Sequence, residues 1–174
     1  ISCWNLEDNG STSMRQRTNK GYKERRIDPF DTPELEVMDI RLSNKCNLQC
    51  KMCYAGNSDQ IAKNIISATE AGQLDPKLAK DENALHYSNA GNIDPVKGLY
   101  EFIIDNKSIR QLKFAGGEPF VMPEVEELMI KLIKAGRTNL HIFFLTNCTT
   151  VKTNVLEILR QFDSTSIGCS IDGV

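Results

Sequence analysis

The feature that most constrains the fold of this 174-residue chain is a regular alternation between strand-like and helix-like patterns. Short apolar or alternating stretches predict strands at residues 37–42, 109–115, 140–145 and 165–171. Helical spacing of apolar side chains predicts helices at residues 58–71, 96–105, 123–135 and 151–162. A repeated strand–helix order implies parallel strands joined by helical crossovers. The fold class is therefore α/β, and the periodicity alone fits both an open doubly wound sheet and a barrel.

The predicted strands differ in what their two faces carry. Residues 140–145 are almost continuously apolar, which predicts a strand covered on both faces. In residues 37–42 apolar side chains alternate with a mixed face that carries Asp39 and Arg41, and Lys113 lies on the mixed face of the second strand. If these faces line a lumen, the three charged residues contact substrate. An ordinary charge-balancing role fits the pattern equally well.

Polar and glycine-rich residues gather after each predicted strand. They are the cysteine-rich residues 46–53, the glycine-rich residues 116–119, Thr146 with Asn147, and residues 170–173. In parallel α/β folds, ligands bind at the carboxyl ends of the strands. We therefore expect these four segments to meet at one site.

The distribution of the six cysteines indicates metal or redox chemistry. Cys46, Cys50 and Cys53 fall within eight residues, whereas Cys3, Cys148 and Cys169 are scattered. A secreted disulfide framework spreads its cysteines through a small, loop-rich chain, which this pattern does not match.

The spacing of the three clustered cysteines favours an iron–sulfur cluster with one open iron. Electron-transfer clusters take four cysteines, so three ligands leave a position at which a substrate or cofactor can bind. A zinc knuckle is the alternative, but zinc needs a fourth ligand, and His86 and His141 offer no paired spacing.

The stretch Cys46-Asn47-Leu48-Gln49-Cys50-Lys51-Met52-Cys53 resembles the signature of the radical S-adenosylmethionine (radical SAM) superfamily. The resemblance implies that the three cysteines bind a [4Fe–4S] cluster and that Met52 packs near the adenine of S-adenosylmethionine.

Three further motifs extend this resemblance. Gly116-Gly117-Glu118-Pro119 resembles the motif that binds the methionyl amino group, and glycines allow such a close approach of backbone to a ligand. Thr146-Asn147 resembles the end of the family's third strand, with Cys148 where a glycine is usual. Ser170-Ile171-Asp172-Gly173 resembles a fourth-strand motif associated with S-adenosylmethionine, which implicates Ser170 and Asp172. Cys148 is either a reactive thiol or a small buried residue.

The resemblance covers residues 34–174 and implies a partial (β/α) barrel. The family core has six strand–helix units, and four are visible here, so we expect a radical SAM core that is truncated at its C-terminus. The implied activity is reductive cleavage of S-adenosylmethionine to a 5′-deoxyadenosyl radical, which abstracts a hydrogen atom from an unknown substrate. The implied partners are an external electron donor and, by analogy with relatives that carry auxiliary modules, a peptide substrate.

Residues 1–33 are polar, basic and poorly periodic, and we interpret them as the remnant of a preceding module plus a linker. The segment around Cys3 resembles the end of a SPASM or twitch module, which implies that Cys3 is a ligand of an auxiliary iron–sulfur cluster. A free buried cysteine beside Trp4 is the alternative. Six basic residues between Arg15 and Arg26 form a solvated linker or, alternatively, a patch for an anionic partner.

The net charge and the length of the apolar runs argue against two classes of protein, those that bind nucleic acid and those that cross a membrane. The net charge is −2, which argues against a nucleic-acid-binding domain. No apolar run approaches the ~20 residues that cross a membrane, and no start resembles a signal peptide, so we expect a cytoplasmic protein. The alternative to an enzyme is a non-catalytic iron–sulfur or zinc module that binds a partner through the basic stretch.

Overall fold

The computed structural model describes residues 3–22, 34–75, 77 and 95–171. The chain divides into two compact units, Ile1–Pro33 and Glu34–Val174. Asp172 and His86 lie outside the described residues, as does most of residues 72–95, where the sequence predicts no firm element. Among the described residues, no helix has the length and apolar character needed to cross a membrane.

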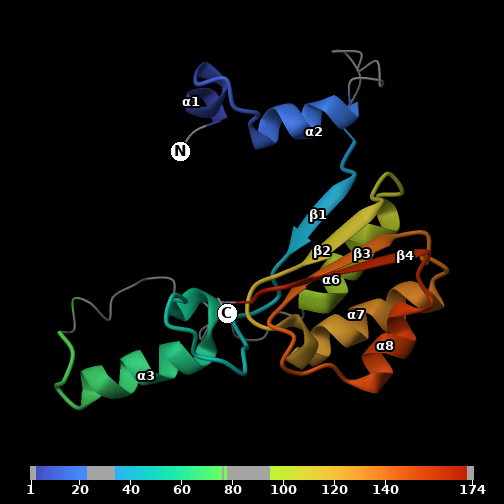
Figure 1. Cartoon of the computed structure of the whole chain (residues 1–174). Coiled ribbons are helices and arrows are strands. Elements are labelled where there is room, and N and C mark those ends of the chain that lie inside the picture. Colours follow the sequence, from blue (N-terminus) through green and yellow to red (C-terminus); the bar gives the residue numbers. More distant parts are fainter. Residues whose placement is uncertain (1–2, 23–33, 76, 78–94, 172–174) are drawn as a thin grey trace. The chain divides into compact units, whose positions relative to one another are not determined.

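The second unit is built on one parallel sheet whose strands lie in their order along the chain (Figure 1). Each strand pairs in parallel with the next, so that Asp39 is opposite Lys113 and Leu145 is opposite Gly168. Three strands are shorter than the sequence predicts: β1 (Val37–Ile40), β2 (Gln111–Phe114) and β4 (Ser164–Cys169). The remaining strand, β3 (His141–Thr146), has the predicted length and begins one residue later than predicted.

Helices α6 (Pro95–Asp105), α7 (Pro123–Lys134) and α8 (Thr153–Leu159) lie together on one side of this sheet (Figure 1). They bury Leu112 and Phe114 of β2 and Ile142 and Phe144 of β3, and the rings of Phe114 and Phe144 stack at 5.0 Å between centroids. No residue of β4 is buried. Sequential parallel strands with these helices on one face correspond to part of a (β/α) barrel and not to a doubly wound sheet, which has helices on both faces. The sheet is not a closed barrel, and the partial-barrel prediction is confirmed.

The opposite face of the sheet is open to solvent in places, so the prediction that residues 140–145 are covered on both faces is wrong. Leu140, Ile142 and Phe144 are fully buried, but Phe143 is half-buried and Leu145 is 40% exposed. The apolar run arises because β3 packs on the helices through one face and carries large apolar side chains on the other.

The helices agree with the sequence pattern within a few residues. The second unit contains α3 (Asp59–Glu70), α6 (Pro95–Asp105), α7 (Pro123–Lys134) and α8 (Thr153–Leu159), with short 3-10 turns η1 (Ala55–Asn57) and η2 (Pro119–Val121). Helix α7 begins at Pro123 and has acidic residues in its first turn and lysines in its last, which complement the helix dipole.

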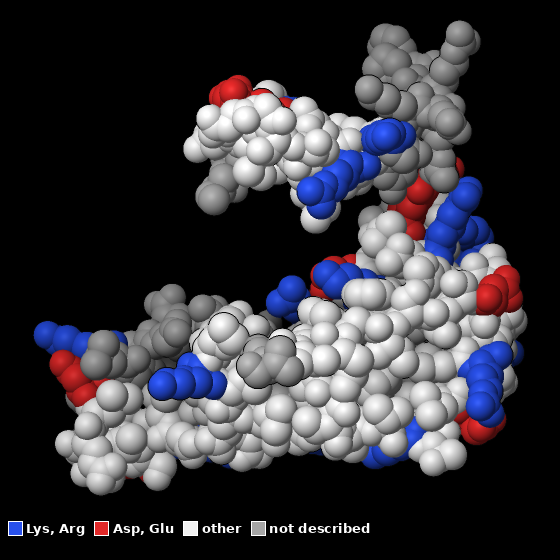
Figure 2. All heavy atoms as spheres, in the orientation of Figure 1, with Lys and Arg blue, Asp and Glu red and all other residues white. Residues whose placement is uncertain are grey.

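The first unit contains two helices that the sequence pattern does not predict, α1 (Cys3–Asp8) and α2 (Met14–Tyr22). The Glu7 carboxylate accepts hydrogen bonds from Ser13 and Arg15, and the Arg15 guanidinium lies 3.8 Å from the centre of the Trp4 ring. These polar contacts stabilise helices that lack an apolar stripe. Basic side chains cover part of α2 (Figure 2).

Candidate functional site

The candidate site lies at the carboxyl ends of the four parallel strands, where the four motif segments begin. The cysteine loop follows β1, residues 116–119 follow β2, Thr146 ends β3, and Ser170 follows β4. The Ser170 N–H donates to the Thr146 carbonyl at 2.7 Å, which joins the ends of β3 and β4. The expectation that strand-end motifs lie side by side is met for the described residues of these segments.

Glu118 joins the end of β2 to the end of β3. Its side chain is fully buried, and its Oε1 accepts hydrogen bonds from Thr146 Oγ1 at 2.6 Å and from the Phe120 N–H at 3.1 Å. Oε2 accepts the Asn147 N–H at 2.8 Å. A buried carboxylate needs such donors to offset the loss of water. Glu118 therefore positions Thr146 and Asn147 in this structure.

The two glycines of the same motif allow two backbone segments to pass very close to each other. A Cβ on Gly117 would lie 2.2 Å from the Lys45 carbonyl oxygen, and Gly116 has a φ of 112°, a conformation that side chains disfavour. The Glu118 N–H donates to the Lys45 carbonyl at 2.8 Å. The glycines thus bring residues 116–118 against the start of the cysteine loop.

The base of the cysteine loop is closed by hydrogen bonds to the start of α3. The Cys46 N–H donates to Asp59 Oδ1 at 3.0 Å, and the Ser58 hydroxyl donates to the Leu48 carbonyl at 2.8 Å. Asn44 Nδ2 donates to the Ala55 carbonyl at 2.9 Å. Ser58 is fully buried and also caps α3. Sequence reasoning missed these residues, although a Ser-Asp pair before an apolar run is a recognisable helix start.

The turn after β3 contacts the cysteine loop from the other side. Asn147 Nδ2 donates to Asn47 Oδ1 at 3.0 Å, and Asn47 Nδ2 donates to Thr149 Oγ1 at 2.9 Å. Asn47 directly follows Cys46, so these bonds tie the turn to the predicted cluster ligands. No sequence signal identifies Asn47 and Thr149, because the contact joins residues about one hundred positions apart.

The three clustered cysteines are free, half-buried thiols on one loop. Burial raises the pKa of Cys46, and the nearby Glu118, Cys53 and Cys50 raise it further as like charges. The Cys53 N–H donates to the Cys50 carbonyl at 2.9 Å, which turns the loop between these two residues. An open hollow of about 340 Å³ lies beside Cys50 and Cys53 and is bounded by apolar residues of α3.

The donor chemistry fits an iron–sulfur cluster, because three unpaired thiols stand on one short loop. The three thiols do not converge on one point in this structure. Within residues 3–22, 34–75, 77 and 95–171, no three cysteine, histidine or acidic side chains lie close enough together to hold a metal ion. The assignment of Cys46, Cys50 and Cys53 as ligands therefore stays a prediction.

Comparison with known proteins identifies the family. The model of the radical SAM superfamily matches residues 40–174, which is most of the chain. The chain belongs to the radical SAM superfamily. This membership rests on residues 40–174 and does not define the reaction of the whole protein.

Two curated proteins are similar to this radical SAM chain. An uncharacterized protein of Methanocaldococcus jannaschii is 26% identical over 137 residues, which cover 78% of this chain and 38% of that protein. The radical SAM cyclopropyl synthase TigE of Paramaledivibacter caminithermalis is 24% identical over 149 residues, which cover 82% of this chain and 28% of TigE. The chain thus spans well under half the length of both relatives, and no solved structure matches it.

The remaining predicted radical SAM cofactor residues lie around the same strand ends. Pro119 is buried in η2, Asn147 is half-buried, and Ser170 is exposed. Met52 is 81% exposed on the cysteine loop. Asp172 falls outside the described residues, and Cys3 is a free, half-buried thiol in the first unit.

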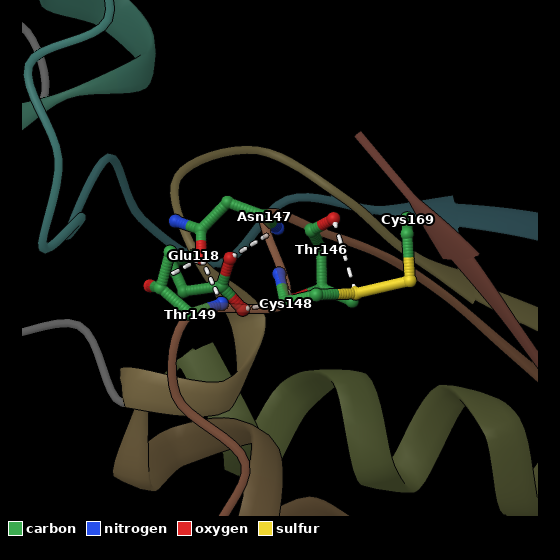
Figure 3. The surroundings of a disulfide bond; sticks show 6 residues. All are labelled: Glu118, Thr146, Asn147, Cys148, Thr149 and Cys169. Carbon is green, nitrogen blue, oxygen red and sulfur yellow. Dashed lines mark hydrogen bonds between the residues drawn. A yellow bond between two sulfur atoms is a disulfide. The ribbon is translucent and has the colours of Figure 1, made fainter. Parts of the chain in front are cut away.

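Cys148 forms a disulfide with Cys169 at the carboxyl ends of β3 and β4 (Figure 3). Both residues are exposed, so the interpretation of Cys148 as a small buried residue is wrong. The positions of the two cysteines in neighbouring parallel strands bring their Cα atoms to 5.8 Å, within the ordinary disulfide range. Sequence reasoning missed this pair because the partners lie 21 residues apart with a helix between them.

Charged side chains lie on the face of the sheet opposite α6, α7 and α8. Lys113 Nζ donates to Asp39 Oδ2 at 2.9 Å, and Arg41 Nε lies 3.4 Å from Asp39 Oδ1. The hydrogen bond from Lys113 is the largest cause that lowers the pKa of Asp39. A Cβ on Gly116 would lie 3.5 Å from Arg41 Cβ, so the charged group borders the glycine motif.

Proposed function

We propose that the full-length protein is a radical SAM enzyme that binds a [4Fe–4S] cluster through Cys46, Cys50 and Cys53. It binds S-adenosylmethionine at the adjoining strand ends and abstracts a hydrogen atom from its substrate. The observation that carries this proposal is the bonding of three motifs into one group. Glu118 joins the ends of β2 and β3, while Asn47 and Lys45 join both to the cysteine loop.

When bound and reduced, the cluster supplies the electron that cleaves S-adenosylmethionine to methionine and a 5′-deoxyadenosyl radical. The protein contributes binding, orientation and exclusion of water. The predicted cofactor residues are Met52, Gly116, Gly117, Glu118, Pro119, Thr146, Asn147, Ser170 and Asp172. Because the Glu118 oxygens already accept three hydrogen bonds, we assign this side chain a positioning role and assign the ammonium contact to the backbone of its motif.

The face of the sheet opposite α6, α7 and α8 is the surface we propose for the substrate. Asp39, Arg41 and Lys113 lie on it next to the glycine motif and carry two positive charges against one negative charge. A peptide substrate, an external electron donor and a cytoplasmic location complete the proposal. Their support is the family resemblance and the free thiols, which persist in a reducing compartment.

We also propose that the first unit derives from a SPASM or twitch module and that Cys3 binds an auxiliary cluster. The support is the sequence resemblance together with a free, half-buried thiol in α1. Residues 3–22 contain no second cysteine, so further ligands of such a cluster would come from other parts of the full-length protein.

The test is anaerobic reconstitution of the full-length protein, followed by measurement of iron, sulfide and zinc and by chromatography for 5′-deoxyadenosine after addition of a strong reductant. We expect a filled cluster and 5′-deoxyadenosine, both lost in the Cys46→Ala, Cys50→Ala and Cys53→Ala variants. A filled cluster without 5′-deoxyadenosine would contradict the proposed enzymatic activity. Bound zinc would favour a non-catalytic binding module. Iron in excess of about four per chain, lost in Cys3→Ala, would support the auxiliary cluster.

A further inference from the structure

The disulfide between Cys148 and Cys169 joins the strand ends that flank the proposed cofactor site. Cys169 ends β4 and pairs with Thr146 of β3, and Cys148 stands two residues beyond Thr146. Both cysteines are exposed residues, which is the position that a disulfide needs in order to exchange with a reductant in solution. The bond therefore lies at the strand ends and not in the core.

Cys148 is held in an uncommon backbone conformation next to the Glu118 hydrogen bonds. Its φ is 56°, in the left-handed region that favours glycine, and it is the only non-glycine residue with positive φ among those the structure describes. The Cys148 N–H donates to Thr146 Oγ1 at 3.0 Å, and that hydroxyl donates to Glu118 (Figure 3). Cys148, the residue with this uncommon backbone conformation, therefore also carries the disulfide.

The same turn reaches the cysteine loop. Asn147 and Thr149 flank Cys148, and both form hydrogen bonds with Asn47, the residue after Cys46. A change in the mobility of Cys148 would therefore reach Asn47 through the two residues that flank Cys148. These are neighbouring residues in one hydrogen-bonded group, so no longer pathway is needed.

The other cysteines of the described chain are free thiols, and a radical SAM cluster needs thiol ligands. In compartments where thiols persist, disulfides are usually transient and redox-active. We propose that Cys148 and Cys169 form a redox-active thiol–disulfide pair, reduced by dithiols, that sets how firmly residues 147–150 are held against the cysteine loop. The effect on cluster binding rests on the proposed function, whereas exchange of this disulfide with a dithiol can be measured without a cluster.

The reaction is thiol–disulfide exchange with a dithiol reductant. One thiolate of the reductant attacks a sulfur of the pair and forms a mixed disulfide, and its second thiolate then displaces the remaining protein thiol. Two electrons and two protons pass to Cys148 and Cys169, and the reductant leaves as its own disulfide. Reduction frees Cys148 from the crosslink and leaves its turn conformation to the hydrogen bonds alone.

The first experiment measures the redox state in the full-length protein. The anaerobic protein is equilibrated at graded ratios of reduced to oxidised dithiothreitol, trapped with N-ethylmaleimide and digested with trypsin. We expect the peptide of residues 138–152 to be linked to the peptide that begins at Gln161, with the linked fraction falling as the ratio rises. Alkylation of both cysteines at every ratio, or a link that persists at every ratio, would overturn the proposal.

The second experiment measures hydrogen exchange before cluster loading, so that its result does not depend on the proposed function. We expect several-fold faster exchange at residues 45–53 and 147–150 after reduction. The Cys148→Ser, Cys169→Ser and double variants should match the reduced protein and one another, because each removes the same bond. Additive effects of the single variants, or unchanged exchange, would overturn the coupling.

Cys148→Gly separates the crosslink from the backbone conformation. Glycine adopts positive φ without the penalty of a side chain, but it cannot form the disulfide. We expect its exchange at residues 45–53 to exceed that of the oxidised wild type. If Cys148→Gly instead matches the oxidised protein, the turn conformation suffices and the crosslink has no role. Formation of 5′-deoxyadenosine by a protein that fails these tests would leave the proposed function intact.

Discussion

Glu118 shows how a residue predicted to bind a ligand also determines the structure around that ligand. Its carboxylate is fully buried and accepts three hydrogen bonds, from Phe120 of η2, from Thr146 at the end of β3 and from Asn147 just after it. Replacing a buried carboxylate that accepts three hydrogen bonds destabilises the fold. Each donor that loses its acceptor then stays buried without a hydrogen bond to protein or water. The side chain is therefore important for stability as well as for the geometry of the site.

We expect Glu118→Gln to lower the free energy of unfolding by about 2 kcal/mol. The NH2 group of the new side-chain amide is itself a donor, and it would face one of the N–H or O–H donors that the carboxylate now accepts. Urea denaturation of the full-length protein measures this change. The matched control is Glu157→Gln, which alters an exposed pair with Arg160 on α8 and should cost less than about 0.5 kcal/mol. Equal effects of the two substitutions would contradict the role assigned to Glu118.

Gly117 and Gly98 predict opposite outcomes for the same substitution. Gly117→Ala places a methyl group 2.2 Å from a carbonyl oxygen and should destabilise the protein by about 3 kcal/mol. Gly98 lies in α6 with nothing within 4 Å of an added Cβ, so Gly98→Ala should stabilise by about 0.5–1 kcal/mol. Thermal and urea unfolding check both signs. A neutral Gly117→Ala would show that residues 43–45 and 116–118 are not in close contact.

At the scale of elements, the start of α3 and the cysteine loop form one structural unit. Ser58 caps the helix and donates to the Leu48 carbonyl within the loop. We expect Ser58→Ala to cost about 1 kcal/mol from the lost cap and to lower the iron retained after reconstitution. Ser67→Ala in the same helix alters an exposed position and should leave the iron content unchanged. Iron analysis of both variants distinguishes a loop effect from a general loss of helix.

The pairing of β1 with β2 predicts a pH dependence. Lys113 lowers the pKa of Asp39 below its ordinary value of 3.8. The stabilising contribution is therefore present above about pH 4 and is lost as the pH falls through the lower pKa of the folded state. Because the pair is partly exposed, it contributes about 0.5 kcal/mol.

Asp39→Asn should accordingly be less stable than the wild type at pH 6, and the difference should shrink as the pH falls below about 4. Urea midpoints at a series of pH values from 6 downward measure the difference. In the Lys113→Gln background, Asp39→Asn should lose most of this pH dependence, because the partner charge is absent. An undiminished effect in that background would assign the stabilisation to another group.

The sequence predicts elements better than it predicts contacts between them. Apolar periodicity locates all four strands and the helices of the second unit, because burial against a sheet imposes that pattern. It misses α1 and α2, whose polar contacts through Glu7, Arg15 and Trp4 leave no periodic signal. Motif resemblance locates the strand-end segments. The bonds of Asn47 with Asn147 and Thr149, and the disulfide of Cys148 with Cys169, become visible only when the strands are placed side by side.

At the scale of the whole molecule, cluster loading should protect distant parts of the sequence together. We expect slower hydrogen exchange at residues 43–59 and 147–150, because the turn and the loop are joined by hydrogen bonds. Exchange within α7 should change little. Protection confined to residues 43–59 would contradict the joined arrangement, and added protection at residues 3–22 would support an auxiliary cluster at Cys3.

The bond between Asn47 and Asn147 spans 100 residues, and this separation has a consequence for biosynthesis. A ribosome that adds ~5–20 residues per second needs about 5–20 s to make the second partner after the first. During that interval the nascent chain carries three thiols without the turn that borders them. Delivery of iron and sulfide to this protein should therefore follow translation of β3. Carriers that act on the released chain would find the cysteine loop hydrogen-bonded to the turn, whereas carriers that act at the ribosome before β3 is made would find it without these bonds.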